Sequence, residues 1–264
     1  MLNLSKANYY SEDANREYLS ASQFKAFMEC EAAAFAVMHN LYIPDTTDAL
    51  LIGSYVDAYF EGTLPEFKYE HPELYRKDGT LKTQYLHADY MISRVKRDAF
   101  FMQGMSGEKQ VIMTGEIAGV PYKIKVDSLL SNAIVDLKTV KDFEPIWNPV
   151  TRKREHFISR WGYDIQGAVY REIVRQNTGK TLPFYIFAVT KERPEPDLQA
   201  YWIPDSYLDT AMAVIEDLTP RFQKIKQGQM QPTRCGHCAY CRRTKKLTRP
   251  IDFTTELEVY HAAE

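Results

Sequence analysis

The segment from residue 120 to residue 140 constrains the fold more than any other part of the chain, because it has the pattern of a β-hairpin. Residues 122–127 alternate apolar and polar side chains, which is the period-two signature of a strand with one buried face. Ser131 and Asn132 follow as a turn, since Asn tolerates left-handed backbone angles. Residues 133–140 are β-branched and largely apolar, like a strand buried on both faces. The sequence therefore predicts two antiparallel strands joined by a tight turn.

Charged residues within this hairpin need a special reason to be there. Asp136 and Lys138 lie two residues apart and so share one face of their strand. If the strands pair about the turn, Asp127 lies opposite or nearly opposite Asp136. Two adjacent carboxylates repel unless a cation neutralises them, and oxygen ligands suit Mg²⁺ or Mn²⁺. A nearby lysine can orient a water or stabilise charge on a phosphate. The hypothesis is metal-assisted phosphodiester hydrolysis; the alternative is strand-end aspartates with a solvated lysine.

Composition limits the class of protein. With 264 residues, 45% of them hydrophobic, the chain can bury one large core. Lys and Arg total 33 against 35 for Asp and Glu, so any DNA site must come from local clustering of basic residues. We find no targeting leader and no apolar run long enough to cross a bilayer. We therefore expect a cytoplasmic protein with no membrane partner.

A helix is predicted over residues 46–62, and one of its faces is unusual. Gly53, Asp57 and Glu61 recur every four residues, so they lie on a single face. A glycine there permits close approach to a strand, and the carboxylate of Asp57 could then reach a metal held by that strand. A solvated helix face with an incidental glycine is the alternative.

The other elements are predicted from their hydrophobic periodicity. The predicted strands cover residues 109–117, 182–191 and 198–203. The predicted helices cover residues 21–39, 84–102, 160–177 and 205–226, and the third has a buried stripe of Trp161, Ile165, Val169 and Ile173. We expect one domain over residues 1–231 and a Cys-rich appendage over residues 232–264 that closes onto the N-terminal helix.

Two features are candidates for contact with DNA. Residues 147–160 form a basic loop that includes Arg152 and Arg154 and could hold a phosphate backbone; a solvated surface loop is the alternative. Gln166 and Tyr170 lie four residues apart on the next helix, where an amide and a phenol could hydrogen-bond a phosphate or a base.

The cysteines indicate a metal centre. Cys235, Cys238 and Cys241 have the spacing Cys-x₂-Cys-x₂-Cys, which in ferredoxin-type runs delivers thiolates to three corners of one iron–sulfur cube. The fourth ligand could be Cys30, the only other cysteine in the chain. This run favours a [4Fe–4S] cluster. Zinc is the alternative, and His237 could complete a zinc ligand set.

Taken in order, these motifs resemble those of PD-(D/E)xK nucleases of the RecB-like superfamily, most closely the phage exonuclease VIII (RecE-type) group. The resemblance covers about residues 20–245, and the residues that carry it are Gly53-x-x-x-Asp57, Asp127, Asp136-Leu137-Lys138 and Gln166-x-x-x-Tyr170.

The resemblance implies an α/β fold with a restriction-endonuclease-like core, in which helices flank a mixed β-sheet. It also implies hydrolysis of the ends of linear duplex DNA with Mg²⁺ or Mn²⁺. The implied catalytic residues are Asp127, Asp136 and Lys138; the implied metal ligands are Asp57, Asp127, Asp136 and the Leu137 carbonyl; and Gln166 and Tyr170 would contact DNA. Many relatives have a histidine at the position of Asp57, which leaves the number of metals open.

Some members of the superfamily hold an iron–sulfur cluster with one cysteine before the nuclease core and three after it. Cys30, Cys235, Cys238 and Cys241 have that arrangement. Relatives often space the last pair more widely than Cys238-x₂-Cys241, which keeps zinc open.

The resemblance further implies a role in phage homologous recombination by strand annealing. A 5′ to 3′ polarity, a toroidal homo-oligomer, a single-strand annealing partner protein and, for a phage protein, location in the host bacterial cytoplasm are implied in the same way. The rivals are a single-strand-specific nuclease or an endonuclease of the same fold, and a non-catalytic DNA-binding module. Catalysis is favoured, because a pure binder gains nothing from two carboxylates that face phosphate.

Overall fold

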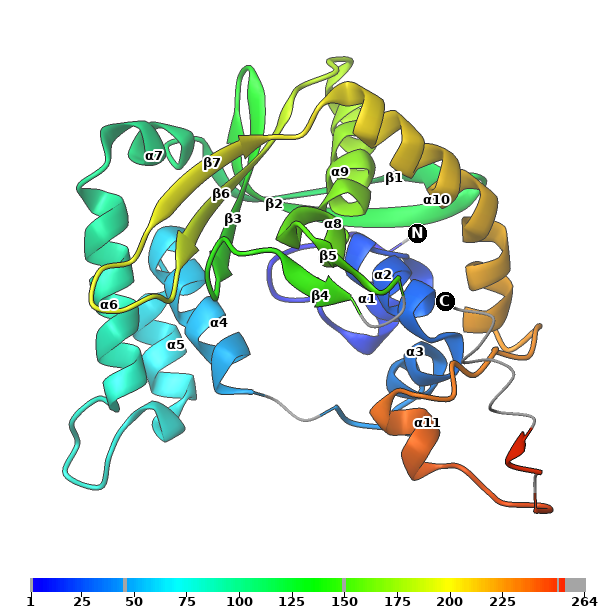
Figure 1. Ribbon diagram of the computed structural model, residues 1–264. Helices are drawn as coiled ribbons and strands as arrows, with labels where there is room; N and C mark the ends of the chain where they lie inside the picture. The colour runs from blue at the N-terminus through cyan, green and yellow to red at the C-terminus, as the bar shows by residue number, and fades with distance from the viewer. Residues whose placement is uncertain (1, 45–46, 149–150, 251, 255–264) are drawn as a thin grey trace.

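The computed structural model describes residues 2–44, 47–148, 151–250 and 252–254. Its centre is one mixed β-sheet (Figure 1). The strand order is β1-β2-β3-β6-β7. Only the β3–β6 pairing is parallel among the four pairings of this sheet. The strands are β1 (Glu108–Ile117), β2 (Val120–Leu130), β3 (Ala133–Val140), β6 (Phe184–Thr190) and β7 (Leu198–Trp202). Helices flank this sheet, which confirms the expected α/β fold.

Each face of the sheet packs against its own set of helices. One hydrophobic cluster joins the sheet to α2 (Ala21–Glu29), α9 (Tyr163–Thr178) and α10 (Asp205–Lys226). The other joins it to α4 (Asp48–Glu61) and α6 (Thr83–Lys96). Strand β3 contributes alternate residues to the two clusters, as a strand buried on both faces must.

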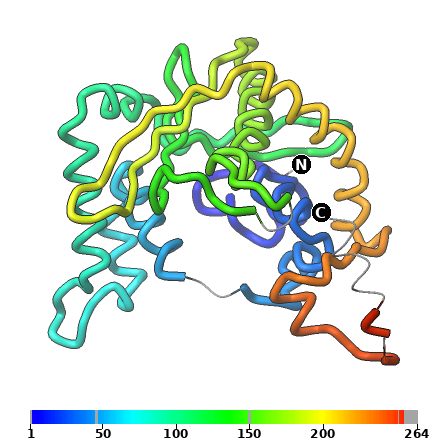
Figure 2. Tube along the Cα trace, viewed as in Figure 1, coloured from blue at the N-terminus to red at the C-terminus, as the bar shows by residue number. Residues whose placement is uncertain are grey.

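Shorter elements complete the fold. They are α1 (Glu12–Glu17), α3 (Glu31–Met38), α5 (Leu64–Glu70), a 3₁₀ turn (Pro72–Leu74), α7 (Ala99–Gly104), α8 (Phe157–Arg160), α11 (Ala239–Arg243), and the paired strands β4 (Ile146–Asn148) and β5 (Lys153–Glu155). Helix α11, near the end of the chain, contacts α3, near its beginning (Figure 2). Within the described residues, no helix is both long enough and apolar enough to cross a membrane.

The helix predicted over residues 21–39 is wrong in one respect, because it is interrupted at Cys30. This residue has extended backbone angles (φ −165°, ψ 107°) and caps both α2 and α3. The first N–H groups of α3 have no partner inside the helix. That of Ala32 donates to the Thr233 carbonyl, in the C-terminal region, at 3.0 Å. Tertiary contacts thus override the helix propensity of an Ala-rich segment.

The helix predicted over residues 160–177 begins later, at Tyr163. Gly162 adopts left-handed angles (φ 59°) that separate α8 from α9. As a result Trp161, expected in the buried stripe, lies outside the helix and is 44% exposed.

Two further segments differ from expectation. The helix predicted over residues 84–102 is divided at Asp98, whose side chain accepts a hydrogen bond from the Phe101 N–H at 2.8 Å and so begins α7. Part of the predicted basic loop forms the β4–β5 hairpin, while residues 149–150 lie outside the described part of the chain.

Candidate active site and metal centre

The β2–β3 hairpin brings Asp127 and Asp136 together, as the sequence predicts. Ser128 pairs with Val135, so the two aspartates occupy the next position on each strand. The Leu137 N–H donates to Asp127 Oδ2 at 3.0 Å, which ties this carboxylate to the neighbouring strand. Two acidic side chains therefore face one point beside the middle of the sheet.

Helix α4 adds a third carboxylate to this point. A Cβ atom on Gly53 would lie 3.0 Å from Thr139 Oγ1 on β3, so the glycine lets the helix approach the strand closely. Asp57 follows one turn later and is close enough to Asp127 for mutual repulsion. Burial, and then this repulsion, raise the pKa of Asp57 well above its usual value. Glu61, one turn further on, adds a smaller repulsion of the same sign.

Asp136 is held by two neighbours in a buried position, with its side chain only 2% exposed. Its Oδ1 atom accepts a hydrogen bond from Gln166 Nε2 at 2.6 Å. Its Oδ2 atom lies 2.5 Å from Lys138 Nζ as an ion pair, yet accepts no hydrogen bond from any residue that the structure describes. The ammonium group of Lys138 is therefore the only partner of this oxygen among the described residues.

The site holds three acidic groups against one lysine. Burial, and then repulsion from Asp136, raise the pKa of Asp127 to about 7. Burial acts to lower the pKa of Lys138, but the carboxylates of Asp136 and Asp127 outweigh it and raise that pKa. A divalent cation would offset the repulsion among these acidic groups. These residues therefore fit Mg²⁺ or Mn²⁺.

Sequence reasoning missed Gln110, which lies on β1 beside Asp127. Its side chain is 5% exposed and its backbone is left-handed (φ 55°), which is rare for a residue other than glycine. Its Nε2 atom donates to Asp127 Oδ1 at 3.4 Å, and its Oε1 atom is buried without a partner among the described residues. The sequence gives no distinct signal for Gln110, because it follows the polar residues Glu108 and Lys109 at the start of the strand.

The residues predicted to contact DNA have different surroundings. Gln166 is 8% exposed, and its amide donates a hydrogen bond to Asp136 and so positions that carboxylate. Its contact with DNA remains a prediction. The Tyr170 hydroxyl donates to the Lys125 carbonyl at 3.1 Å.

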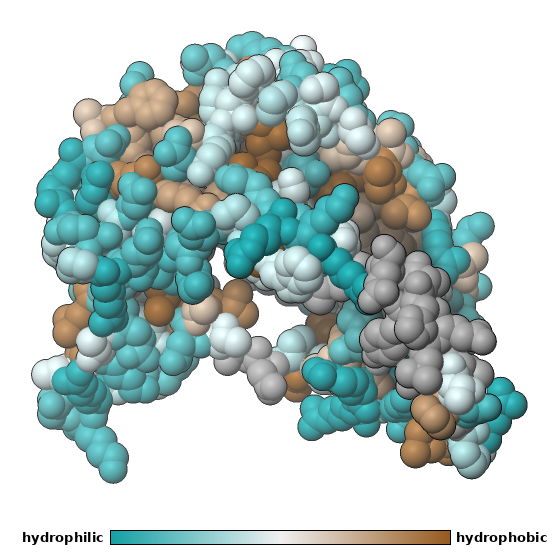
Figure 3. Space-filling view, viewed as in Figure 1, coloured by the Kyte–Doolittle hydropathy of each residue, from teal (hydrophilic) through white to brown (hydrophobic). Residues whose placement is uncertain are grey.

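Arg152 and Arg154 are exposed on the β4–β5 hairpin. Arg154 also donates to the Pro145 carbonyl at 2.9 Å. In the space-filling view, hydrophilic side chains at the place of this hairpin border a hollow between the regions of α4 and α11 (Figures 1 and 3). The hairpin that carries the two arginines therefore lies beside this hollow.

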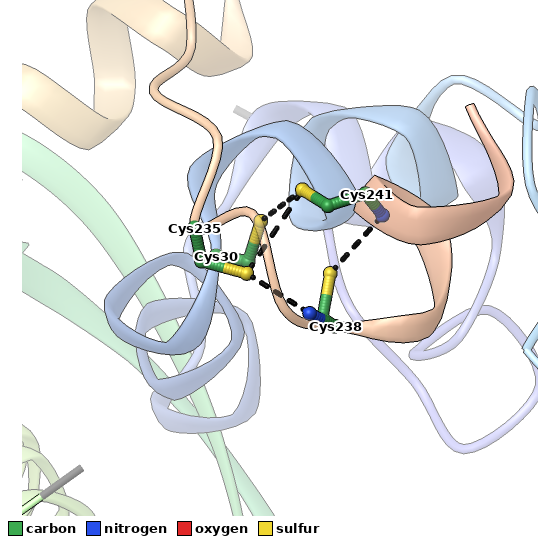
Figure 4. A group of neighbouring side chains, drawn as sticks. All are labelled: Cys30, Cys235, Cys238 and Cys241. Carbon is green, nitrogen blue, oxygen red and sulfur yellow. Dashed lines mark hydrogen bonds between the residues drawn. The ribbon is translucent and has the colours of Figure 1, made fainter. Parts of the chain in front are cut away.

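The four cysteines meet at a second site, shown in Figure 4, and form no disulfide. Their sulfur atoms all lie within 4.8 Å of one another. Cys30 Sγ is 3.6 Å from Cys241 Sγ, and Cys235 Sγ is 3.9 Å from Cys241 Sγ. No other group of three or more His, Cys, Asp or Glu side chains in the described chain is this compact.

Four thiols form a donor set that fits a metal. The Sγ–Sγ distances of 3.6 and 3.9 Å are close to the distance between two sulfur atoms of a tetrahedral zinc–thiolate site. That distance is about 3.8 Å for Zn–S bonds of about 2.3 Å. Thiolates on separate irons of a cube would lie farther apart, because the cluster stands between them. Burial acts to raise the pKa of Cys235, but hydrogen bonds from the N–H groups of Cys238 and His237 outweigh it and lower that pKa to about 6. A thiolate is thus available near neutral pH.

Contacts around the cysteines bind the two ends of the chain together. Glu31, next to Cys30, accepts hydrogen bonds from Arg221 of α10 at 2.6 and 2.8 Å. The same carboxylate accepts from the Thr233 N–H at 2.7 Å. The cysteine group therefore lies where α2, α3, α10 and the C-terminal region join.

Comparisons with known proteins place the chain among relatives. The family model described as "PDDEXK-like domain of unknown function (DUF3799)" matches residues 20–244. A crystal structure from Eubacterium rectale, described as a "putative exonuclease", is 42% identical over 97% of this chain and 98% of that chain, with a TM-score of 0.91. A structure of SSO0001 is 14% identical over 80% of this chain and 91% of that chain, with a TM-score of 0.31 that supports no argument. No curated protein matches the chain.

Proposed function

We propose a function from one premise, that the chain belongs to the family of PDDEXK-like domains described as DUF3799. The function is metal-dependent hydrolysis of phosphodiester bonds in DNA, with the ends of linear duplexes as the substrate. One observation carries the proposal above the others: Asp127, Asp136 and Lys138 meet beside Asp57, so that three crowded acidic groups face one lysine.

Asp57, Asp127, Asp136 and the Leu137 carbonyl would hold Mg²⁺ or Mn²⁺. When bound, such an ion supplies a Lewis acid and lowers the pKa of a water molecule. Gln166 holds Asp136 in place through its 2.6 Å hydrogen bond. Lys138 is protonated at neutral pH, because the pKa of its ammonium group is raised. We assign Lys138 to orienting the attacking water and stabilising charge that develops on the phosphate.

Exonuclease action is supported by the similarity to the Eubacterium rectale protein, whose description names that activity. An endonuclease or single-strand-specific nuclease would use the same carboxylates. A non-catalytic DNA-binding module would have no use for an excess of buried acids at its DNA site.

The direct test is digestion of linear and covalently closed duplex DNA by the purified protein with Mg²⁺, Mn²⁺ or EDTA. Loss of the linear form alone, only with metal, is the expected result. Cleavage of the closed form would establish an endonuclease instead. Salt-sensitive binding without any cleavage would overturn the proposal in favour of a binding module.

We also propose that the four cysteines hold a structural metal centre. The Cys-x₂-Cys-x₂-Cys run supports a [4Fe–4S] cluster, and the sulfur spacings of 3.6 and 3.9 Å support a single zinc ion. Metal analysis after anaerobic purification distinguishes them: iron with acid-labile sulfide identifies the cluster, and one zinc per chain identifies the ion. A protein that contains neither iron nor zinc would contradict the proposal of a metal centre.

The division into a nuclease domain (residues 1–231) and a Cys-rich appendage (residues 232–264) remains a prediction. Contacts of Thr233 and the cysteines with α3 support an appendage that closes onto the N-terminal helices. The recombination role, the annealing partner and the homo-oligomer remain predictions from the family resemblance.

A further inference from the structure

We propose that Lys25 binds a phosphate of the DNA strand in the candidate active site. The inference rests on the proposed function and adds to it a substrate-binding residue that lies about a hundred positions before the catalytic hairpin.

Lys25 lies on α2 but reaches the site of Lys138. Its Nζ atom is 4.9 Å from the centroid of the Tyr163 ring, and Lys138 Nζ is 5.1 Å from the same centroid. Tyr163 is the first residue of α9. Two ammonium groups from separate elements therefore share one aromatic ring, which partly stabilises each of them.

Gly162 provides the room that Lys25 needs. A Cβ atom at this position would lie 2.9 Å from Lys25 Cδ and 3.4 Å from Lys25 Cγ. The left-handed backbone of Gly162 also turns the chain so that α9 starts beside the lysine. The glycine that ended the predicted helix early is thus part of the cradle for this side chain.

The charge of Lys25 has no partner of opposite sign within ion-pair distance among the described residues. The one hydrogen bond that its ammonium group makes within that part of the chain goes to the Trp161 carbonyl at 3.1 Å. A lysine ammonium has three donors, so two remain for a ligand. Burial, and then the charge of Lys138, lower the pKa of Lys25 to about 8, which keeps the group protonated at neutral pH.

Lys25 and Lys138 repel each other, and the carboxylates of Asp136, Asp164 and Glu29 attract Lys25 only from beyond ion-pair distance. A further anion beside Lys25 would therefore offset its burial and this repulsion. A non-bridging phosphate oxygen of DNA supplies that anion and accepts hydrogen bonds from lysine. Such a contact positions the strand without reading its sequence. Its loss should therefore weaken binding of all sequences alike.

The experiment measures binding of a linear duplex oligonucleotide in EDTA, where cleavage cannot interfere, over a range of salt concentrations. Lys25→Met should reduce the slope of log K against log salt by about 0.9, which corresponds to about eightfold weaker binding at 0.1 M salt. Lys25→Arg keeps the charge and should retain most of the slope.

Lys180→Met is the matched control. Lys180 is exposed and follows the C-terminal end of α9, about 24 Å along the helix from Tyr163. Its replacement should change neither affinity nor slope.

An unchanged slope in Lys25→Met would overturn the proposal, even if affinity fell, because Lys25 would then act only by holding the Trp161 carbonyl. Absence of DNA binding by the unmodified protein would overturn it as well. If the unmodified protein cleaves no DNA but Lys25→Met still reduces the slope, the proposed nuclease function is wrong and the phosphate contact stands.

Discussion

The carboxylates of the candidate active site lower the stability of the metal-free protein. Folding brings Asp57, Asp127 and Asp136 out of water and close together. Each of the two raised pKa values means that the folded protein holds a proton that the unfolded chain would release. The site is therefore suited to binding a cation more than to stabilising the fold.

Asp127→Asn should stabilise the protein in EDTA at pH 8. The pKa of Asp127 rises on folding from 3.8 to about 7. Below about pH 4 the carboxyl is protonated in both states and the penalty is absent. As pH rises from 4 to 7 the penalty grows, and above 7 it is complete. We expect a gain on the order of 1–3 kcal/mol at pH 8.

Thermal unfolding of both proteins between pH 4 and pH 8 measures this difference. It should shrink toward pH 4, where an amide and a protonated carboxyl are alike in charge. A stability difference independent of pH would contradict the assigned repulsion.

Individual residues of the site differ in how well the sequence predicts them. Asp127, Asp136 and Lys138 are predictable because strand alternation and a turn fix their register within twenty residues. Lys25 is not, since it reaches the site only through tertiary packing. Gln110 reaches Asp127 through the pairing of β1 with β2, but its left-handed backbone takes it out of the regular register. No local pattern separates such residues from ordinary polar positions.

At the scale of elements, the interruption between α2 and α3 has a structural consequence. It points Cys30 toward Cys241 and gives the start of α3 its contacts with Thr233 and Arg221. Helix periodicity indicated one continuous helix because it contains no information about such partners. The same limit explains the division at Asp98, where a capping side chain acts within a helical pattern.

Cys30→Ser should lose bound metal and lower the melting temperature by several degrees, because metal binding and folding are coupled in such sites. Metal content and thermal unfolding check this. Ala36→Ser is the matched control, since Ala36 is buried on α3, as Cys30 is at the N-cap of that helix, but lies outside the cysteine group. Full metal content in Cys30→Ser would show that Cys30 is an ordinary buried residue.

The β4–β5 hairpin should contribute to DNA affinity. Replacing Arg152 and Arg154 together by Ala should weaken duplex binding in EDTA and reduce the salt slope by up to about 1.8, if each contacts one phosphate. The exposed Lys180→Ala variant serves as the reference. Unaltered binding by the double variant would exclude the hairpin from the DNA interface.

At the scale of the whole molecule, the sheet supports two sites with different chemistry. The carboxylate site lies where α4 approaches β3, and the cysteine site joins the N-terminal helices to the C-terminal region. The α/β fold and the mixed sheet could be predicted, since periodicity identifies strands and helices of ordinary length. The shape of the hollow in Figure 3 could not, because it depends on how distant segments pack.

The central claim is that Asp136 and Lys138 catalyse metal-dependent cleavage of DNA. The most direct measurement is the rate at which the unmodified protein, Asp136→Asn and Lys138→Ala degrade one end-labelled linear duplex in Mg²⁺, Mn²⁺ or EDTA. We predict cleavage by the unmodified protein with metal only, and rates reduced at least about 100-fold in both variants with DNA binding retained. Cleavage by the unmodified protein in EDTA, or equal rates in the variants, would contradict the account.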